Sequence, residues 1–263
     1  MTAADSPSDL SLALALADTA DSLALDRFRA ADLVISTKPD RTPVTDADQA
    51  VERAIREQLA QHRPGDGVYG EEFGVEGSTD RQWIIDPIDG TANFLRGVPV
   101  WGTLIALAVD GEPVLGVASC PALGRRWWAS RGQGAWTSAS GGEPRAISVS
   151  AVGALSDASL SFQSIAQWRE AGYLQPLLAL AEQVWRDRAY GDLWSYMLLA
   201  EGLVDAVGEF GVQRYDVAAL IPIVEEAGGR WSDLRGGRDL DAGSSFASNG
   251  ILHDAVLEAL ALE

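Results

Sequence analysis

The chain has 263 residues, 47% of them hydrophobic, which is enough for one large domain or two closely packed lobes. Its formal net charge of −18 argues against a nucleic-acid partner and against binding to an anionic membrane, because both of these carry negative charge themselves. One cysteine and two histidines exclude an intrachain disulfide and a cysteine-rich zinc site, so a metal site would need oxygen ligands and a hard cation such as Mg²⁺ or Mn²⁺.

Two helices are expected near the N-terminus. Ser8 can cap a helix over residues 10–30, whose leucines and alanines suit packing against another helix. Thr45 begins a second helix, in which apolar side chains recur every four residues from Val51 and form one face. No apolar run approaches the roughly 20 residues of a membrane span, and the N-terminus lacks the basic stretch of a signal peptide. We therefore expect a cytoplasmic protein with no membrane partner.

The middle and the end of the chain alternate between strand and helix patterns. Short apolar stretches punctuated by glycine and proline predict strands: VYG, WIID, TLIALAV, VLGVASC, RRWWAS, AISVS and, later, VDAVGEF, GGRWSDL and SSFASNG. Helices are predicted over residues 168–187, 194–202, 216–227 and 251–262. Helices that enclose more than one sheet indicate an αβαβα sandwich. We expect a single domain over residues 1–263, with lobes of roughly 1–150 and 151–263.

The segment WIIDPIDGTANF carries the strongest chemical signal. Asp86 and Asp89 follow an apolar run that should be buried, where an unpaired carboxylate is costly and two carboxylates repel each other. Asp-Pro and Asp-Gly are also turn dipeptides, so a tight turn is the simpler explanation. A divalent cation would remove both penalties, and Thr91 can begin a helix whose first N–H groups suit a phosphate. Together these features indicate metal-assisted phosphoryl chemistry.

Three other segments place acidic residues that could complete such a site. Glu71 follows the predicted strand VYG, Asp48 lies near the start of the second helix, and Asp216 begins a later helix. Each has a simpler explanation as well. Acidic residues cap and stabilise helix N-termini, and Glu71 could belong to an exposed acidic pair.

Four segments carry a family resemblance: VTDADQAVE, GEE, WIIDPIDGTANF and GEFGVQRYDVAALIPIVEEAGG. In this order, and over nearly the whole chain, they resemble the inositol monophosphatase superfamily of Mg²⁺-dependent, lithium-sensitive phosphatases. The resemblance implies an αβαβα sandwich and two to three Mg²⁺ ions in each site, for which Mn²⁺ can substitute. It also implies a homodimer, in which Trp127 and Trp128 would serve for packing or for contacts between subunits.

The resemblance implies a role for each matching acidic residue. Glu71, Asp86 and the backbone carbonyl of Ile88 would hold one metal ion. Asp86, Asp89 and Asp216 would hold a second ion. Glu71 would also border a third ion that is mostly hydrated.

The same resemblance assigns the remaining catalytic parts. Asp48 and Thr91, together with Glu71, would orient and deprotonate the attacking water. Backbone N–H groups of Gly90 and Thr91 would bind the phosphate. Metal ions would lower the pKa of water, neutralise the phosphate and stabilise the leaving alkoxide.

The later segments bear on the leaving group. Asp192 lies in GDLW, where inositol phosphatases have a stretch of small residues, and Glu209 lies in GEFG. Two acidic side chains suit a cationic leaving group. The stretches RRWWAS and RAYGDLWSY also resemble the histidinol-phosphate phosphatases of this superfamily, particularly the actinobacterial type. We therefore expect hydrolysis of L-histidinol phosphate, a step of histidine biosynthesis, although Asp192 could instead only cap the next helix.

Other functions stay open. A phosphatase for inositol 1-phosphate or for several sugar phosphates would use the same metal site. A regulator without catalytic activity would keep the fold but is expected to lose some of the acidic positions. A carboxylate-lined metal store would leave the phosphate-binding helix start unexplained.

Overall fold

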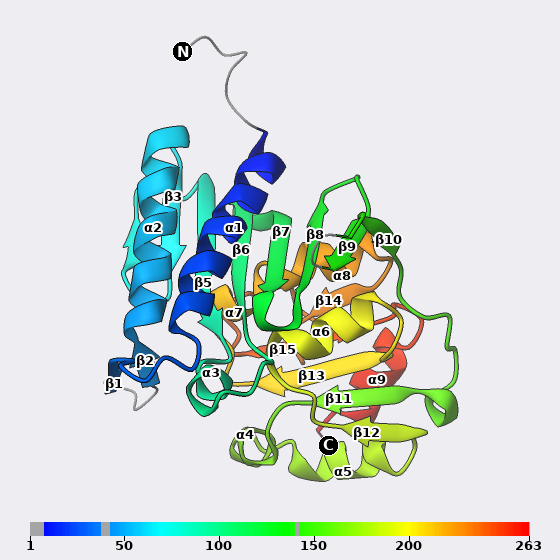
Figure 1. The fold of residues 1–263 in the computed structure, drawn as a ribbon. Helices are drawn as coiled ribbons and strands as arrows, with labels where there is room; N and C mark the ends of the chain where they lie inside the picture. The colour runs from blue at the N-terminus through cyan, green and yellow to red at the C-terminus, as the bar shows by residue number, and fades with distance from the viewer. Residues whose placement is uncertain (1–7, 38–42, 140–141, 263) are drawn as a thin grey trace.

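The fold is built on two sheets, with helices between them and on their outer faces (Figure 1). The computed structural model describes residues 8–37, 43–139 and 142–262. A separate antiparallel pair is formed by β1 (Ile35–Thr37) and β2 (Pro43–Thr45). Two short 3₁₀ turns cover residues Pro121–Leu123 and Leu155–Asp157.

The larger sheet has eight strands in the order β10-β9-β8-β7-β6-β5-β3-β4. Neighbouring strands are antiparallel, except that β3 and β5 are parallel. The strands are β3 (Gly67–Gly70), β4 (Gly74–Glu76), β5 (Arg81–Asp89), β6 (Gly102–Val109), β7 (Glu112–Cys120), β8 (Arg125–Ser130), β9 (Ala135–Ala139) and β10 (Arg145–Ile147). The central strands β5 and β6 are buried along most of their length because both faces of the sheet are covered.

The smaller sheet has five strands in the order β12-β11-β13-β15-β14. Strand β11 runs parallel to both β12 and β13, and the remaining pairs are antiparallel. The strands are β11 (Ser159–Phe162), β12 (Arg186–Arg188), β13 (Ala206–Phe210), β14 (Arg230–Ser232) and β15 (Ser244–Ser248).

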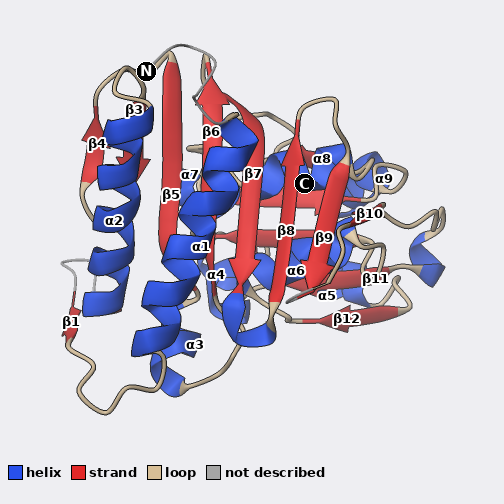
Figure 2. Cartoon of the chain, turned by 45° about the horizontal axis from the view of Figure 1, so that its top comes forward, coloured by secondary structure: helices blue, strands red, loops and turns tan. Residues whose placement is uncertain are grey.

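Three helical layers complete the sandwich. Figure 2 shows α1 (Asp9–Arg27) and α2 (Asp46–His62) across the outer face of the larger sheet. Between the sheets lie α6 (Asp192–Ala200) and α8 (Leu220–Glu226), whose apolar side chains form one core with β6, β7 and β8. The outer face of the smaller sheet is covered by α4 (Ile165–Glu170), α5 (Leu174–Ala181) and α9 (His253–Ala259). The predicted αβαβα sandwich is confirmed.

Two of the predicted helices are wrong in extent. Residues 168–187 do not form one helix: Gly172, at φ +83°, separates α4 from α5, and the segment ends in the short strand β12. Residues 216–227 form two helices, α7 (Arg214–Val217) and α8. Pro222 has no N–H to donate to the carbonyl four residues earlier, so the chain turns at Ala218 and Ala219.

The remaining helix, α3 (Thr91–Arg96), follows directly on β5. Within the described residues, the structure contains no helix with the length and apolar character that crossing a membrane requires.

Candidate active site

Strand β5 brings the two aspartates of the DPID segment to the same side. On a regular strand, residues three apart point to opposite faces of the sheet. Here the register with β6 shifts between Asp86, which pairs with Leu104, and Asp89, which pairs with Gly102. This irregularity, of the kind found next to active sites, turns both carboxylates toward one cluster.

The cluster consists of Asp86, Asp89 and Asp216, each of which offers one carboxylate oxygen within 4.8 Å of the others. Asp86 is only 2% exposed, and its Oδ1 has no hydrogen-bond partner in the part of the chain that the structure describes. Burial raises the pKa of Asp86 and of Asp89 well above the ordinary value, and neighbouring carboxylates raise both further. Three oxygen donors with an orphaned buried atom fit a divalent cation.

Glu71 and Ile88 flank this cluster. Glu71 directly follows β3, and its backbone N–H donates to the Ile85 carbonyl at 3.2 Å. Its negative charge raises the pKa values of Asp86 and Asp216, which places it in the same electrostatic environment. The Ile88 carbonyl accepts a hydrogen bond from the Thr91 hydroxyl at 3.0 Å.

Asp48 is the third residue of α2, and Asp216 is the third residue of α7. Each closes a capping box with the residue that directly precedes its helix. Asp48 Oδ2 accepts from the Thr45 N–H at 2.8 Å and from its hydroxyl at 2.5 Å. Asp216 Oδ2 accepts from the Gln213 N–H at 2.6 Å. The simpler explanation by capping therefore holds, but it uses one oxygen of each carboxylate and leaves the other for the site.

The turn at Gly90 places Thr91 beside Asp48. Gly90 has φ +81°, and a Cβ there would lie 3.2 Å from the Val100 carbonyl oxygen and 3.3 Å from Asp192 Oδ2. The chain can therefore pass through this point only with glycine. Thr91 begins α3, and its Oγ1 lies 3.4 Å from Asp48 Oδ1.

Asp192 does not cap its helix. Its side chain instead accepts hydrogen bonds from Asn93 Nδ2 and Gln163 Nε2, both at 2.9 Å, and makes no capping bond. Its backbone is left-handed, with φ +48°, and its N–H donates to Gln163 Oε1 at 3.0 Å. Sequence reasoning missed both amide partners. Asn93 lies inside the DGTANF motif, but Gln163 is 29 residues away and gives no local signal.

Glu209 completes an acidic pocket. This carboxyl is 6% exposed, accepts from the Tyr196 hydroxyl at 2.7 Å, and has its pKa raised by burial to about 8. The pocket has a volume of about 140 Å³, and four carboxylates line it: Asp89, Asp192, Glu209 and Asp216. The structure thus brings the predicted metal ligands and the predicted leaving-group residues to one place.

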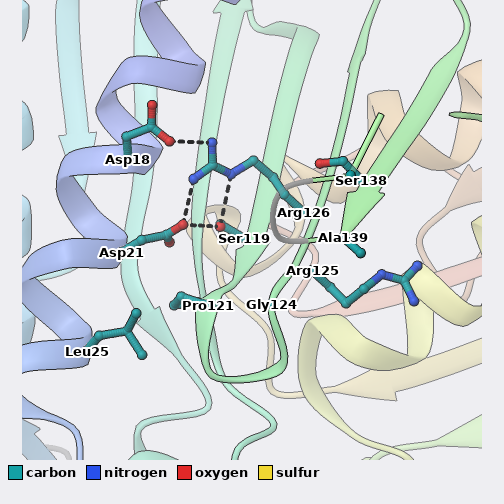
Figure 3. Close-up of a pocket in the computed structure, with 11 residues that line it drawn as sticks. Asp18, Asp21, Leu25, Ser119, Pro121, Gly124, Arg125, Arg126, Ser138 and Ala139 are labelled. Atoms are coloured by element: carbon teal, nitrogen blue, oxygen red, sulfur yellow. Dashed lines mark hydrogen bonds and ion pairs between the residues drawn. The ribbon is translucent and has the colours of Figure 1, made fainter. Parts of the chain in front are cut away.

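A second hollow, of about 350 Å³, lies between α1 and the strands β7 and β8 (Figure 3). Arg126 reaches across it to Asp18 at 2.7 Å and Asp21 at 2.6 Å, and Ser119 joins the network. The Arg126 cation is thus already paired, and the described lining of this hollow includes none of the predicted site residues. Trp127 also lies away from the acidic pocket. It is 1% exposed, donates to Glu201 at 2.8 Å and packs edge-on against Trp194, so its role is packing.

The fold and the site define a class of protein: a phosphatase, in which buried carboxylates at the end of a central strand face the start of a short helix. The chain belongs to the inositol monophosphatase family, whose sequence model matches residues 7–262. The family resemblance drawn from the four motifs is confirmed.

Two bacterial relatives are named histidinol-phosphatase. The one from Mycobacterium tuberculosis is 57% identical over 253 residues, which cover 96% of this chain and 97% of the relative. The one from Streptomyces coelicolor is 52% identical over 253 residues, which cover 95% of each. Among solved structures, an inositol monophosphatase from Zymomonas mobilis is 35% identical, has a TM-score of 0.85, and aligns over 97% of this chain and 98% of its own.

Proposed function

We propose that the protein is a histidinol-phosphatase, which hydrolyses L-histidinol phosphate to L-histidinol and phosphate. The observation that carries this proposal is the pairing of two acid groups, Asp192 and Glu209, on the wall of the pocket that also holds Asp89 and Asp216. Histidinol carries an ammonium and an imidazole group, and carboxylates in a pocket with few apolar contacts complement those charges. The two relatives of that name support the same substrate.

We propose that divalent cations, Mg²⁺ in the first place and Mn²⁺ as a substitute, complete the site. Glu71, Asp86 and the Ile88 carbonyl would hold one ion, Asp86, Asp89 and Asp216 a second, and Glu71 would border a third. When bound, such ions neutralise the phosphate and make water a stronger nucleophile. The buried, unpartnered Oδ1 of Asp86 supports this assignment, since a carboxylate is stable in such a place only beside a cation or a proton.

The chain's own residues then move the proton of the attacking water. Burial raises the pKa of Asp48, which makes its carboxylate a better base, and the Thr91 hydroxyl oxygen lies 3.4 Å from its Oδ1. Thr91 has one hydroxyl proton and two acceptors, the Ile88 carbonyl and Asp48 Oδ1. When Thr91 donates its proton to Asp48 rather than to the Ile88 carbonyl, which would hold an ion, its oxygen is free to accept a hydrogen bond from water. The water oxygen bonds to phosphorus as the ester P–O bond breaks, and the water proton passes through Thr91 to Asp48. The leaving alkoxide takes one proton from solvent, to which Asp48 afterwards returns its own, so the step balances.

Backbone N–H groups at Gly90 and Thr91 are proposed to bind the phosphate. Gly90 is the N-cap and Thr91 the first residue of α3, so both N–H groups need partners outside the helix. Asp89 and Asp216 would border the substrate as well as the metal.

A comparison of kcat/KM for histidinol phosphate and inositol 1-phosphate, with Mg²⁺, tests the substrate. A higher value for inositol 1-phosphate would contradict the proposal.

Inositol 1-phosphate, or a range of sugar phosphates, is the second candidate. The amide groups of Gln163 and Gln167 on the pocket wall favour it, because they can bind the hydroxyl groups of a neutral polyol. A catalytically silent regulator is disfavoured, since the predicted ligands, the base Asp48 and Thr91 are all present and close together.

We also propose that residues 1–263 act as a single domain, in which the lobe of residues 1–150 supplies most metal ligands and the lobe of residues 151–263 supplies the leaving-group residues, Asp192 from α6 and Glu209 from β13. A homodimer and a cytoplasmic location remain predictions. Light scattering on the purified protein tests the first, and fractionation of cells the second.

A further inference from the structure

A line of buried polar groups runs through the smaller sheet and ends on Glu209. Glu209 in β13 lies directly opposite Ser245 in β15, and Tyr196 of α6 reaches between them from the layer above. The Tyr196 hydroxyl is 2.7 Å from Glu209 Oε1 and 2.7 Å from Ser245 Oγ. Trp231 Nε1, from β14, is 2.9 Å from the same Ser245 oxygen. Tyr196 and Ser245 are fully buried, and Trp231 is 2% exposed.

The donors and acceptors in this line can be ordered. An indole N–H can only donate, so Trp231 donates to Ser245 Oγ. A carboxylate can only accept, so Tyr196 gives its single hydroxyl proton to Glu209 Oε1. The remaining 2.7 Å contact is then a hydrogen bond that Ser245 donates to the Tyr196 oxygen. Each hydrogen bond polarises the next, so the Tyr196 hydroxyl is a stronger donor to the Glu209 carboxylate than it would be alone.

The other carboxylate oxygen faces a different environment. Among the described residues, Glu209 Oε2 has no hydrogen-bond partner, and Glu209 lines the acidic pocket beside Asp192 and Asp216. Two neighbouring carboxylates repel it. The hydrogen bond from Tyr196 lowers the pKa of Glu209, so without this fixed donor Glu209 would turn away from its neighbours or hold its proton more firmly.

We propose that Trp231, Ser245 and Tyr196 form a hydrogen-bond relay that fixes the Glu209 carboxylate with Oε2 toward the pocket, where it reads the positive charge of the leaving group. The three are positioning residues, because they act on the substrate only through Glu209. This inference rests on the proposed function, since it assumes a cationic leaving group. The selectivity of the pocket for a cationic leaving group would thus depend on three residues that do not line the pocket.

The relay is tested with Tyr196→Phe and Ser245→Ala in the full-length protein with saturating Mg²⁺. Each variant loses one link, so KM for histidinol phosphate should rise about tenfold, the effect of one hydrogen bond to a charged group, while kcat changes by less than about threefold. In a Glu209→Gln background, Tyr196→Phe should raise KM no further, because the group that it positions is already neutral. A KM equal to that of the parent in both variants, or an equal further rise in the double variant, would overturn the relay.

Ser248→Ala is the matched control. Ser248 is a fully buried serine on the same strand, but its hydroxyl bonds to His253 Nδ1 at 3.0 Å and not to the relay. It should lower the melting temperature without raising KM, which separates loss of stability from loss of positioning. The parent protein separates the two proposals: if it prefers inositol 1-phosphate, the proposed substrate fails. The relay fails if its variants leave KM unchanged for the ester that the parent prefers, or if Tyr196→Phe raises KM equally in the Glu209→Gln background.

Discussion

Asp48 and Asp216 occupy the same position in two different helices, the third residue, and each caps its own helix with Oδ2. In each case the capping bond fixes the rotamer of the aspartate side chain. The orientation of Oδ1 is therefore set within the helix itself and does not depend on a contact with the sheet. This is why acidic residues at helix starts can be interpreted in two ways: capping is confirmed, and the proposed role in the site uses the oxygen that capping leaves. An asparagine at either position would keep the shape of the carboxylate and lose its charge.

Metal dependence is tested at Asp86. The variant Asp86→Asn should lower kcat/KM by roughly a thousandfold, because the loss of a ligand shared by two proposed ions removes several kcal/mol of transition-state stabilisation. Its metal-free form should be at least as stable as the parent, since the change removes a carboxyl group whose ionised form is disfavoured by burial. Phosphate release and thermal unfolding are the two measurements. Full turnover of the parent in excess EDTA would contradict the metal mechanism.

Thr91 separates chemistry from folding. Thr91→Ala removes the hydroxyl that contacts Asp48 Oδ1, so kcat should fall by about a hundredfold or more, while KM and the melting temperature change little. Thr91→Ser is the matched control, because it keeps the hydroxyl, and it should retain most of the activity. Steady-state kinetics of both variants provides the comparison. Equal rates for Thr91→Ala and the parent would reduce Thr91 to a helix-start residue.

Asp192 is expected to decide between substrates. Asp192→Asn should lower kcat/KM for histidinol phosphate by about one to two orders of magnitude, since a hydrogen bond to a charged group contributes roughly 1.5–3 kcal/mol. Hydrolysis of inositol 1-phosphate should change little, because the proposed metal ligands are untouched. Asn93 and Gln163 both donate to Asp192, so the variant also needs one amide to turn. A structural defect of that kind would lower both activities together and would remove the argument from charge.

Packing between the sheets is tested at Gly116 in β7. A Cβ at this position would lie 2.0 Å from the carbonyl oxygen of Ala219, in the turn that joins α7 to α8. Gly116→Ala should therefore destabilise the protein by about 1–3 kcal/mol and weaken Mg²⁺ binding, because α7 carries Asp216. Gly65→Ala, where no atom lies within 4 Å, should change stability by less than about 1 kcal/mol. Urea unfolding measures the stability of both variants. Equal stabilities of Gly116→Ala and Gly65→Ala would show that β7 and the turn between α7 and α8 can move apart to make room for the methyl group.

The sequence predicts the layered fold and the position of Asp86 and Asp89 because these depend on local pattern. A buried strand followed by two aspartates is visible in nine residues of β5, and the helix starts at Asp48 and Asp216 are visible in their capping residues. The helix over residues 168–187 is wrong because helical periodicity continues across Gly172, whereas the backbone does not.

The supporting contacts could not be predicted in this way. Gln163 reaches Asp192, and Ser245 reaches Tyr196 across 49 residues, through pairings that exist only once the smaller sheet is assembled. Neither residue type stands out in the sequence, since an isolated glutamine after a strand, or a serine within one, is common. Long-range positioning of a carboxylate leaves no periodic signal, and only the register of β13 with β15 reveals it.

The stability of the metal-free protein is expected to fall as the pH rises from about 7 to about 8.5. Burial raises the pKa of Glu209 to about 8 and that of Asp216 to about 7, whereas both lose their protons near 4.5 and 3.8 in an unfolded chain. Between these limits the folded protein holds protons that the unfolded chain has released, so raising the pH favours unfolding by up to about 1.4 kcal/mol per pH unit for each proton. His253, whose pKa burial lowers to about 4, acts in the opposite direction but only at lower pH. Because Mg²⁺ would replace the proton of Asp216, the rise in melting temperature that it causes should be larger at the higher pH. Thermal unfolding with EDTA and with Mg²⁺ measures this, and Glu209→Gln should flatten the pH dependence; a melting temperature that rises with pH in EDTA would contradict the expectation.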